Sequence, residues 1–233
     1  MSSLVSVLKY VRSNGLLGTM AAGLRFAKDV RQAWREADFD RRYGTDTGGV
    51  VDDMERLGVS KERAAHAFGY EAIQLDVFAR IMADLQLSPC DYTFVDFGSG
   101  KGRAVMMAAE SGFVSVVGVE HSPVLHRAAV ENCEKLRRKN PAASPVTLSC
   151  QDAVEFGIPD GDLVCFFYNP FDGTILRRVL DKLWTAYRER PRKLVAVYRN
   201  PSCPEVFESF PFLRLVRGTP SYRVYAAGPT GNA

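Results

Sequence analysis

The stretch Thr93-Phe94-Val95-Asp96-Phe97-Gly98-Ser99-Gly100-Lys101-Gly102 decides how the rest of this sequence is interpreted. Apart from Asp96, its first five residues are β-branched or aromatic, which is typical of a short buried strand. Glycines then recur at every second position, and a helical pattern runs from 102 to 110. Glycine permits a sharp turn and the close approach of a ligand, and the following helix N-terminus offers free N–H groups. The stretch therefore predicts a ligand-binding turn between a strand and a helix.

Downstream of this turn, segments typical of strands alternate with segments typical of helices. Short apolar or β-rich runs predict strands at 93–97, 114–119, 146–150, 163–168, 193–198, 213–217 and 222–226, and helical spacing predicts helices at 102–110, 123–139 and 175–187. Such alternation indicates a parallel sheet covered on both faces. Gly218-Thr219-Pro220-Ser221 is a hairpin signal before the last strand. We expect an α/β fold with a doubly wound, seven-stranded, mostly parallel sheet and an antiparallel last strand.

The residues ahead of the sheet predict an N-terminal helical cap. Phe26, Val30 and Trp34 recur at helical spacing, and basic residues flank them at 25, 28, 31 and 35. This pattern indicates a helix packed on the domain with a solvated charged face, or else a basic amphipathic helix that touches an anionic membrane or a partner. A further helix is expected from near Tyr70. We divide the chain into a cap, 1–68, and a ligand-binding domain, 69–233.

Composition narrows the class of protein. The chain has 233 residues and a net charge of +3, which is too mild to indicate a nucleic-acid partner. Its five cysteines form no C-x-x-C pair, so neither a metal site nor a disulfide framework is expected. Scattered free cysteines suit a reducing compartment, and we therefore expect a cytoplasmic location. The apolar run at 15–24 is too short to span a bilayer and continues into a charged helical pattern.

Two more carboxylates follow the next two predicted strands. Glu120 ends the second strand, 22 residues after Gly98, where a carboxylate accepts hydrogen bonds from ribose hydroxyls. Asp152 and Ala153 follow the third strand, although aspartate there also suits a helix N-cap. A dinucleotide favours G-x-G-x-x-G, whereas this turn has G-x-G-x-G behind Asp96. A carboxylate at that point repels a pyrophosphate and suits a ligand that carries an ammonium group.

The pattern Asp96-x-Gly98-x-Gly100-x-Gly102 resembles motif I of class I S-adenosylmethionine-dependent methyltransferases. The expected seven-stranded sheet, with its last strand inserted antiparallel, resembles their fold. The resemblance implies S-adenosyl-L-methionine as the cofactor, with Glu120 at the ribose and Asp152 and Ala153 near the adenine amino group. It assigns the remaining cofactor contacts to the turn itself, namely Asp96, Gly98, Ser99, Gly100, Lys101 and Gly102.

Tyr168-Asn169-Pro170-Phe171 follows the fourth predicted strand, where the methyl acceptor is expected. Asn-Pro-Phe is similar to the Asn/Asp-Pro-Pro-Tyr/Phe motif of amino methyltransferases, although the second proline is missing. Aromatic side chains there would form a dry wall that disfavours an ammonium and would attract a methylammonium by cation–π contact. Asn169 and the carbonyls near Pro170 would accept hydrogen bonds from an amino group. We expect these four residues to form the catalytic site.

A second resemblance covers roughly residues 69–171. Gly69-Tyr70-Glu71 ahead of the glycine turn, together with the turn and Gly118-Val119-Glu120, resembles the non-SET histone lysine methyltransferase family, which has a Tyr-Gly-Glu stretch at a similar distance. This resemblance implies that Glu71 contacts the cofactor and that the acceptor is a protein amine such as lysine. The alternatives are a small-molecule or natural-product acceptor, a nicotinamide-dependent oxidoreductase and a non-catalytic nucleotide-binding interaction protein.

Overall fold

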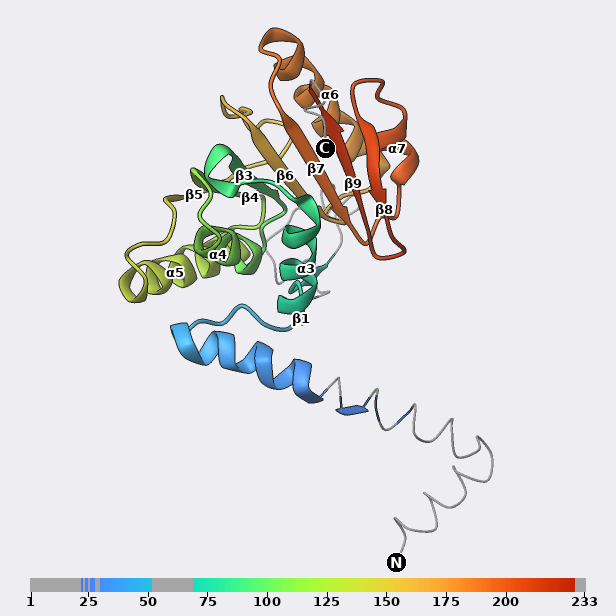
Figure 1. The fold of residues 1–233 in the computed structure, drawn as a ribbon. Coiled ribbons are helices and arrows are strands. Elements are labelled where there is room, and N and C mark those ends of the chain that lie inside the picture. The colour runs from blue at the N-terminus through green and yellow to red at the C-terminus, as the bar shows by residue number, and fades with distance from the viewer. Residues whose placement is uncertain (1–21, 23, 25, 28–29, 52–68, 229–233) are drawn as a thin grey trace, which may run out of the picture.

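The computed structural model describes residues 22, 24, 26, 27, 30–51 and 69–228 of the chain (Figure 1). Seven strands form one sheet in the order β5-β4-β3-β6-β7-β9-β8. In chain order these are β3 (Thr93–Phe97), β4 (Ser115–Glu120), β5 (Val146–Cys150), β6 (Leu163–Tyr168), β7 (Leu194–Arg199), β8 (Arg214–Gly218) and β9 (Tyr222–Ala227). The first five run parallel, and β9 lies antiparallel between β7 and β8. The predicted seven-stranded, mostly parallel sheet is confirmed.

Helices cover both faces of this sheet (Figure 1). On one face, α3 (Leu75–Leu85), α4 (Arg103–Glu110) and α5 (Pro123–Lys139) pack in a core that includes Phe94 of β3. On the other face, α6 (Gly173–Glu189) and α7 (Pro204–Glu208) pack in a core that includes Val95 and Phe97. Successive residues of a strand point to opposite faces. For this reason β3 and β6, which are buried on both sides, are almost continuously apolar.

The chain reverses its direction of travel across the sheet next to β3. From β3 it moves outward through β4 to β5, and it then returns to β6 on the other side of β3. Asp96 of β3 is in register with Gly118 of β4 and Phe166 of β6. The carboxyl ends of these three strands therefore meet at a switch point, which is where open α/β sheets bind ligands.

The segment before the sheet differs from the prediction. Tyr70–Glu71 forms a short strand, β2, that pairs antiparallel with β1 (Val50–Val51), and α3 begins only at Leu75. The expected helix start near Tyr70 is therefore wrong, because this segment pairs with a strand distant in the sequence, which helical spacing does not reveal. The short α7 and the 3-10 helix Pro89–Asp91 were also not predicted. Residues 52–68 of the predicted cap lie outside the described residues.

The helix over residues 30–43 packs on the domain through one buried arginine. Arg103, at the start of α4, is only 4% exposed and pairs with Glu36 and Asp40 of that helix, the latter at 3.2 Å from Nη2. Its Nε donates to Thr47 Oγ1 (2.8 Å), and its Nη1 donates to the carbonyl of Ile73 (3.4 Å). Burial lowers the pKa of Arg103 to about 10, which leaves it charged at neutral pH.

The face by which this helix packs is not the one that the apolar spacing indicated. Phe39 and Tyr43 are buried, whereas Val30 and Trp34 are exposed. The expectation that the Phe26–Trp34 stripe packs on the domain is therefore wrong. The reason is that the ion pairs of Glu36 and Asp40 with Arg103 turn the opposite face of the helix inward. No helix among the described residues is long and apolar enough to cross a membrane.

We expect Arg103→Met to lower the free energy of unfolding by about 3–5 kcal/mol, because it leaves two carboxylates beside an apolar side chain. The matched control is Arg138→Met on α5, whose exposed partner is Glu134 at 3.2 Å. Loss of that surface pair should cost about 0.5 kcal/mol or less. Urea unfolding of both variants checks this prediction, and equal small losses would show that Arg103 does not hold the 30–43 helix.

Candidate active site

The glycine turn after β3 adopts a backbone that only glycine accommodates easily. Gly98, Gly100 and Gly102 all have positive φ angles, of 85°, 54° and 85°, and non-glycine residues rarely adopt such values. The amides of Gly98 and Ser99 donate to the carbonyl of Val119 at 2.9 and 3.0 Å. A Cβ built on Gly98 would lie 2.6 Å from the Cβ of Pro170. The turn is therefore pinned between β4 and the loop that follows β6.

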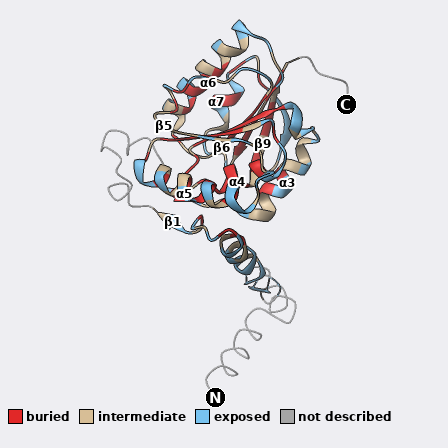
Figure 2. Cartoon of the chain, turned by 90° about the vertical axis from the view of Figure 1, so that its left-hand side faces the viewer, coloured by how far each residue is buried: buried red, intermediate tan, exposed pale blue. Residues whose placement is uncertain are grey.

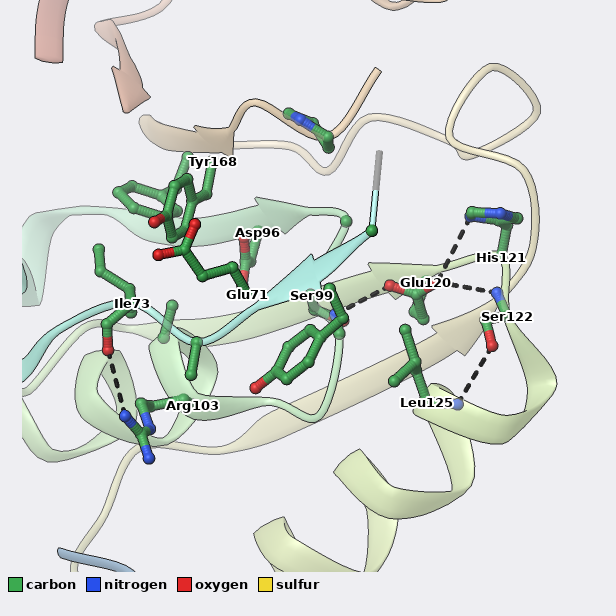
Figure 3. Close-up of a pocket in the computed structure, with 18 of the residues that line it drawn as sticks. Glu71, Ile73, Asp96, Ser99, Arg103, Glu120, His121, Ser122, Leu125 and Tyr168 are labelled. Atoms are coloured by element: carbon green, nitrogen blue, oxygen red, sulfur yellow. Dashed lines mark hydrogen bonds and ion pairs between the residues drawn. The ribbon is translucent and has the colours of Figure 1, made fainter. Parts of the chain in front are cut away.

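Glu120 at the end of β4 fixes this turn from the side (Figure 3). Its Oε2 accepts a hydrogen bond from Gly100 N, and its Oε1 accepts one from Ser122 N, both at 2.8 Å. The Nδ1 of His121 lies 3.4 Å from Oε1. Glu120 is 4% exposed. Each carboxylate oxygen retains capacity for a further hydrogen bond, so this side chain can hold both the turn and a ligand hydroxyl.

Asp96 lies one strand away and has a different environment. It is 3% exposed and lines a cavity at the carboxyl ends of the strands. Burial, followed by the nearby charge of Glu120, raises the pKa of Asp96 to about 8. Within the part of the chain that the structure describes, no cation or hydrogen-bond donor opposes this shift. Asp96 is therefore a buried acid whose charged form needs a partner from outside.

The cavity in front of Asp96 is bordered by further polar atoms that have no partner among the described residues. Ser99 Oγ and His121 Nε2 are buried without a hydrogen bond, and both residues line the cavity. Its volume is about 60 Å³, whereas sites for drug-sized ligands span roughly 300 Å³ or more. The polar groups suit a ligand, but the space in this conformation holds only a part of one.

Tyr70 of β2 accounts for the small volume. A Cβ built on Gly100 would lie 2.2 Å from Cε2 of the Tyr70 ring, so the ring rests directly on the turn. The Tyr70 hydroxyl donates to the carbonyl of Thr47 at 2.6 Å. Burial raises the pKa of Tyr70, with smaller contributions from Asp40 and other nearby acids. The segment from Tyr70 to Ile73 thus closes the cavity, held by the short β1–β2 pairing.

The predicted acceptor residues divide into two groups. Tyr168, Pro170 and Phe171 line the cavity, and Figure 3 shows Glu71 beside Tyr168. Burial and then the charge of Glu71 raise the pKa of Tyr168 to about 12. Asn169 has a positive φ of 40° and does not line the cavity.

The side chain of Asn169 is held by the loop after β7. Its Oδ1 accepts hydrogen bonds from Ser202 Oγ at 2.5 Å and from Tyr198 Oη at 3.3 Å. Neither Ser202 nor Tyr198 was singled out from the sequence, because only the folded sheet brings β6 and β7 together.

The predicted cofactor residues divide similarly. Those that line the cavity are Glu71, Asp96, Gly98, Ser99, Gly100 and Glu120. Lys101 instead reaches outward to Asp46 at 3.2 Å, and Gly102 lies against Ala129. Asp152 Oδ1 accepts from Val154 N at 2.9 Å and so caps a turn, not the helix N-terminus that its residue type also suited. Lys101, Gly102, Asp152 and Ala153 do not line the cavity.

The lining residues that were not predicted as site residues include Tyr70, Arg103 and His121. The only signals in the sequence were the histidine directly after Glu120 and the tyrosine in the Gly-Tyr-Glu stretch. Among the described residues, no group of histidine, cysteine and acidic side chains is arranged to hold a metal ion.

The contact between Tyr70 and the turn can be tested with two alanine substitutions at glycines of positive φ. Gly112→Ala introduces only backbone strain, because nothing lies within 4 Å of its Cβ position, and should cost about 1–2 kcal/mol. Gly100→Ala should cost more, because it also displaces the Tyr70 ring. Urea unfolding in the wild-type and Tyr70→Ala backgrounds checks this. If Gly100→Ala still lowers the free energy of unfolding more than Gly112→Ala in the Tyr70→Ala background, the contact between the ring and the turn is contradicted.

No known protein family matches the sequence, and no curated protein matches it. Its fold is similar to that of several solved structures. An RNA methyltransferase from Salinibacter ruber, solved with S-adenosyl-L-homocysteine, is 20% identical and has a TM-score of 0.46, over 69% of this chain and 95% of its own. A ribosomal protein L11 methylase from Lactobacillus delbrueckii subsp. bulgaricus is 17% identical, with a TM-score of 0.48 over 70% and 80% of the two chains. An S-adenosylmethionine-dependent O-methyltransferase from Thermotoga maritima is 16% identical, with a TM-score of 0.48 over 70% and 69%.

Proposed function

We propose that this protein is an S-adenosyl-L-methionine-dependent methyltransferase. The observation that carries the proposal is Asp96, a buried acid that faces the cavity, with a pKa raised to about 8 and no cation beside it among the described residues. S-adenosylmethionine carries an ammonium group that would stabilise the charged form of this carboxylate. The pyrophosphate of a nicotinamide dinucleotide would instead be repelled by the charged form of Asp96.

The other groups around the cavity fit the same ligand. Glu120 has free acceptor capacity for ribose hydroxyls, and Ser99 Oγ and His121 Nε2 are unpartnered polar atoms in the wall. Lys101 and Gly102 act indirectly in this proposal, by holding the turn against the cap loop and α5. Asp152 and Ala153 are proposed to meet the adenine at the end of β5, as the resemblance implies.

Binding a complete ligand requires the segment from Tyr70 to Ile73 to move outward, because the cavity holds only about 60 Å³. The pairing that retains this segment is short: Val50 with Glu71 and Val51 with Tyr70. Glu71 lies on this segment, so its proposed contact with the cofactor would form as the segment closes again.

The proposed acceptor is a protein amine such as the lysine side chain. When bound, the cofactor supplies a methyl group on a sulfonium, and the protein has to present a neutral nitrogen to it. The buried Phe171 and the half-buried Tyr168 and Pro170 provide an apolar wall, which disfavours the ammonium form and excludes water. Glu71 at the exposed edge of the cavity favours the approach of a cationic side chain. Asn169 is proposed to position this wall through its contacts with the loop after β7.

A small-molecule acceptor is the second candidate, favoured by the closure of the cavity under the cap. An RNA acceptor has weaker support from this chain, whose net charge is only +3. We also propose a cytoplasmic site of action, where the five free cysteines stay reduced. The division into a cap, 1–68, and a binding domain, 69–233, stays a prediction.

We expect cofactor affinity to depend on pH through Asp96. Below about pH 8 the acid must lose a proton to pair with the ligand ammonium, so affinity should rise by up to ~tenfold per pH unit. It should pass through a maximum near about pH 8 and fall above it, because the ligand amine then loses its own proton. Asp96→Asn should weaken binding ~10- to 100-fold and flatten the rise. Calorimetry with S-adenosylmethionine measures both effects, and Asp181→Asn, an exposed acid on α6, is the control.

The Asp96→Asn variant should be more stable than the wild-type protein in the absence of ligand. A carboxyl whose pKa is raised by folding favours the folded state below its unfolded pKa, and that contribution is lost as the pH rises through about 8. Asp96→Asn should therefore raise the melting temperature by a few degrees above about pH 8 and raise it less at lower pH. A variant of unchanged affinity, pH profile and stability would contradict the role of Asp96.

Transfer of labelled methyl groups into a cell extract tests the reaction and the acceptor together. We expect label in the protein fraction that disappears with the Asp96→Ala, Glu120→Ala double variant. Tyr168→Phe and Asn169→Ala should retain cofactor binding but lose at least ~tenfold in transfer, because they alter only the acceptor wall. Label in the small-molecule or RNA fraction would show that the acceptor belongs to that class and is not a protein amine. The absence of both cofactor binding and methyl transfer would refute the proposed function.

A further inference from the structure

The outer face of the N-terminal helix carries a row of exposed apolar side chains. Phe26, Val30 and Trp34 are 71%, 39% and 69% exposed. Their spacing of four residues places them in line along one side of a helix. Large apolar side chains in such a row are uncommon on a surface that meets only water. We call these three residues the apolar row.

The domain leaves most of the apolar row uncovered in this arrangement. Trp34 also borders a groove between this helix and α3 and α4, but it stays 69% exposed. Glu36 and Asp40 pair with the buried Arg103, and Phe39 and Tyr43 are buried beside them. These contacts fix the opposite side of the helix on the domain. Figure 2 shows the described part of this helix extending away from the sheet and its helices, with exposed residues along it.

The charges around the apolar row have one predominant sign. Arg31 and Arg35 are exposed within the same helix, whereas Arg41 and Arg42, farther along it, pair with Asp38. In the sequence, residues 1–35 contain the basic residues Lys9, Arg12, Arg25, Lys28, Arg31 and Arg35 and a single acidic residue, Asp29. An apolar row with a tryptophan and flanking arginines matches the side-chain pattern of helices that lie in the plane of a membrane interface, where indole rings sit at headgroup level and basic side chains meet anionic lipids.

We propose that this face of the helix binds the surface of an anionic phospholipid bilayer. The apolar row enters the boundary between headgroups and acyl chains, and Arg31 and Arg35 contact the lipid phosphates. A single helix that presents a convex apolar row suits a deformable lipid surface, whereas a folded protein partner would need a matching groove. The proposal is independent of the methyltransferase activity, since no residue of the row lines the cavity.

Flotation of the full-length protein with vesicles tests the proposal. Vesicles of phosphatidylcholine alone are compared with vesicles that contain about 30% phosphatidylglycerol, at low salt and at about 0.5 M salt. We expect binding to the anionic vesicles only, reduced several-fold by salt. The triple variant Phe26→Ser, Val30→Ser, Trp34→Ser should lose at least ~tenfold in partition. The control is Val114→Ser, which alters an exposed apolar residue before β4.

A second readout follows the indole ring itself. The chain has two tryptophans, so in a Trp184→Phe background the emission reports Trp34 alone and should shift to the blue on anionic vesicles. Failure of the wild-type protein to float with anionic vesicles would overturn the proposal and leave the row as a docking surface for a protein. Equal flotation of the triple variant, with an unshifted Trp34 emission, would also overturn it, because binding would then be by charge alone. Thermal unfolding of each variant confirms that it is folded.

Discussion

The pairing of one buried guanidinium with two carboxylates is the interaction on which the cap depends. Arg103 opens the helix that follows the glycine turn, and its partners Glu36 and Asp40 come from a helix some sixty residues earlier in the chain. Burying a charge is costly unless the pair is complete, so the arrangement favours a single docked position. Through Thr47 and Ile73, the same side chain also contacts the loop before β1 and the end of the segment Tyr70–Ile73 that closes the cavity.

Two acids at neighbouring strand ends illustrate how environment divides the work of similar side chains. Glu120 accepts backbone hydrogen bonds from both the turn and the start of α5, which stabilise its charge. Asp96 has no such donors among the described residues and is pushed toward its neutral form. One carboxylate therefore organises the site, while the other is held in a state that a cation can change. Such divergence between adjacent titratable groups is common where proteins bind or transform ligands.

The sequence predicted the parts of the fold that depend on local pattern. Hydrophobic periodicity and the positions of glycine and proline were sufficient to predict the strands of the sheet, the turn at Gly98–Gly102 and the bounds of α5 at Pro123 and Lys139. The segment that closes the cavity was not predicted, because Tyr70 and Glu71 form a strand only by pairing with Val50 and Val51. Nor could the spacing show that Arg103 turns the apolar row outward, since ion pairs between distant residues leave no periodic signal.

The contact between Gly98 and Pro170 has a consequence for altering this protein. The space between them admits no methyl group, because a Cβ on Gly98 would approach the proline ring to 2.6 Å. The loop after β6 and the turn after β3 therefore share one wall, and neither can be reshaped alone. An engineer who widened the acceptor side by replacing Pro170 would also loosen the backbone at Gly98. Changes of acceptor range would then have to be sought at Glu71 and Tyr168, whose atoms are not among the nearest to the Cβ position of Gly98.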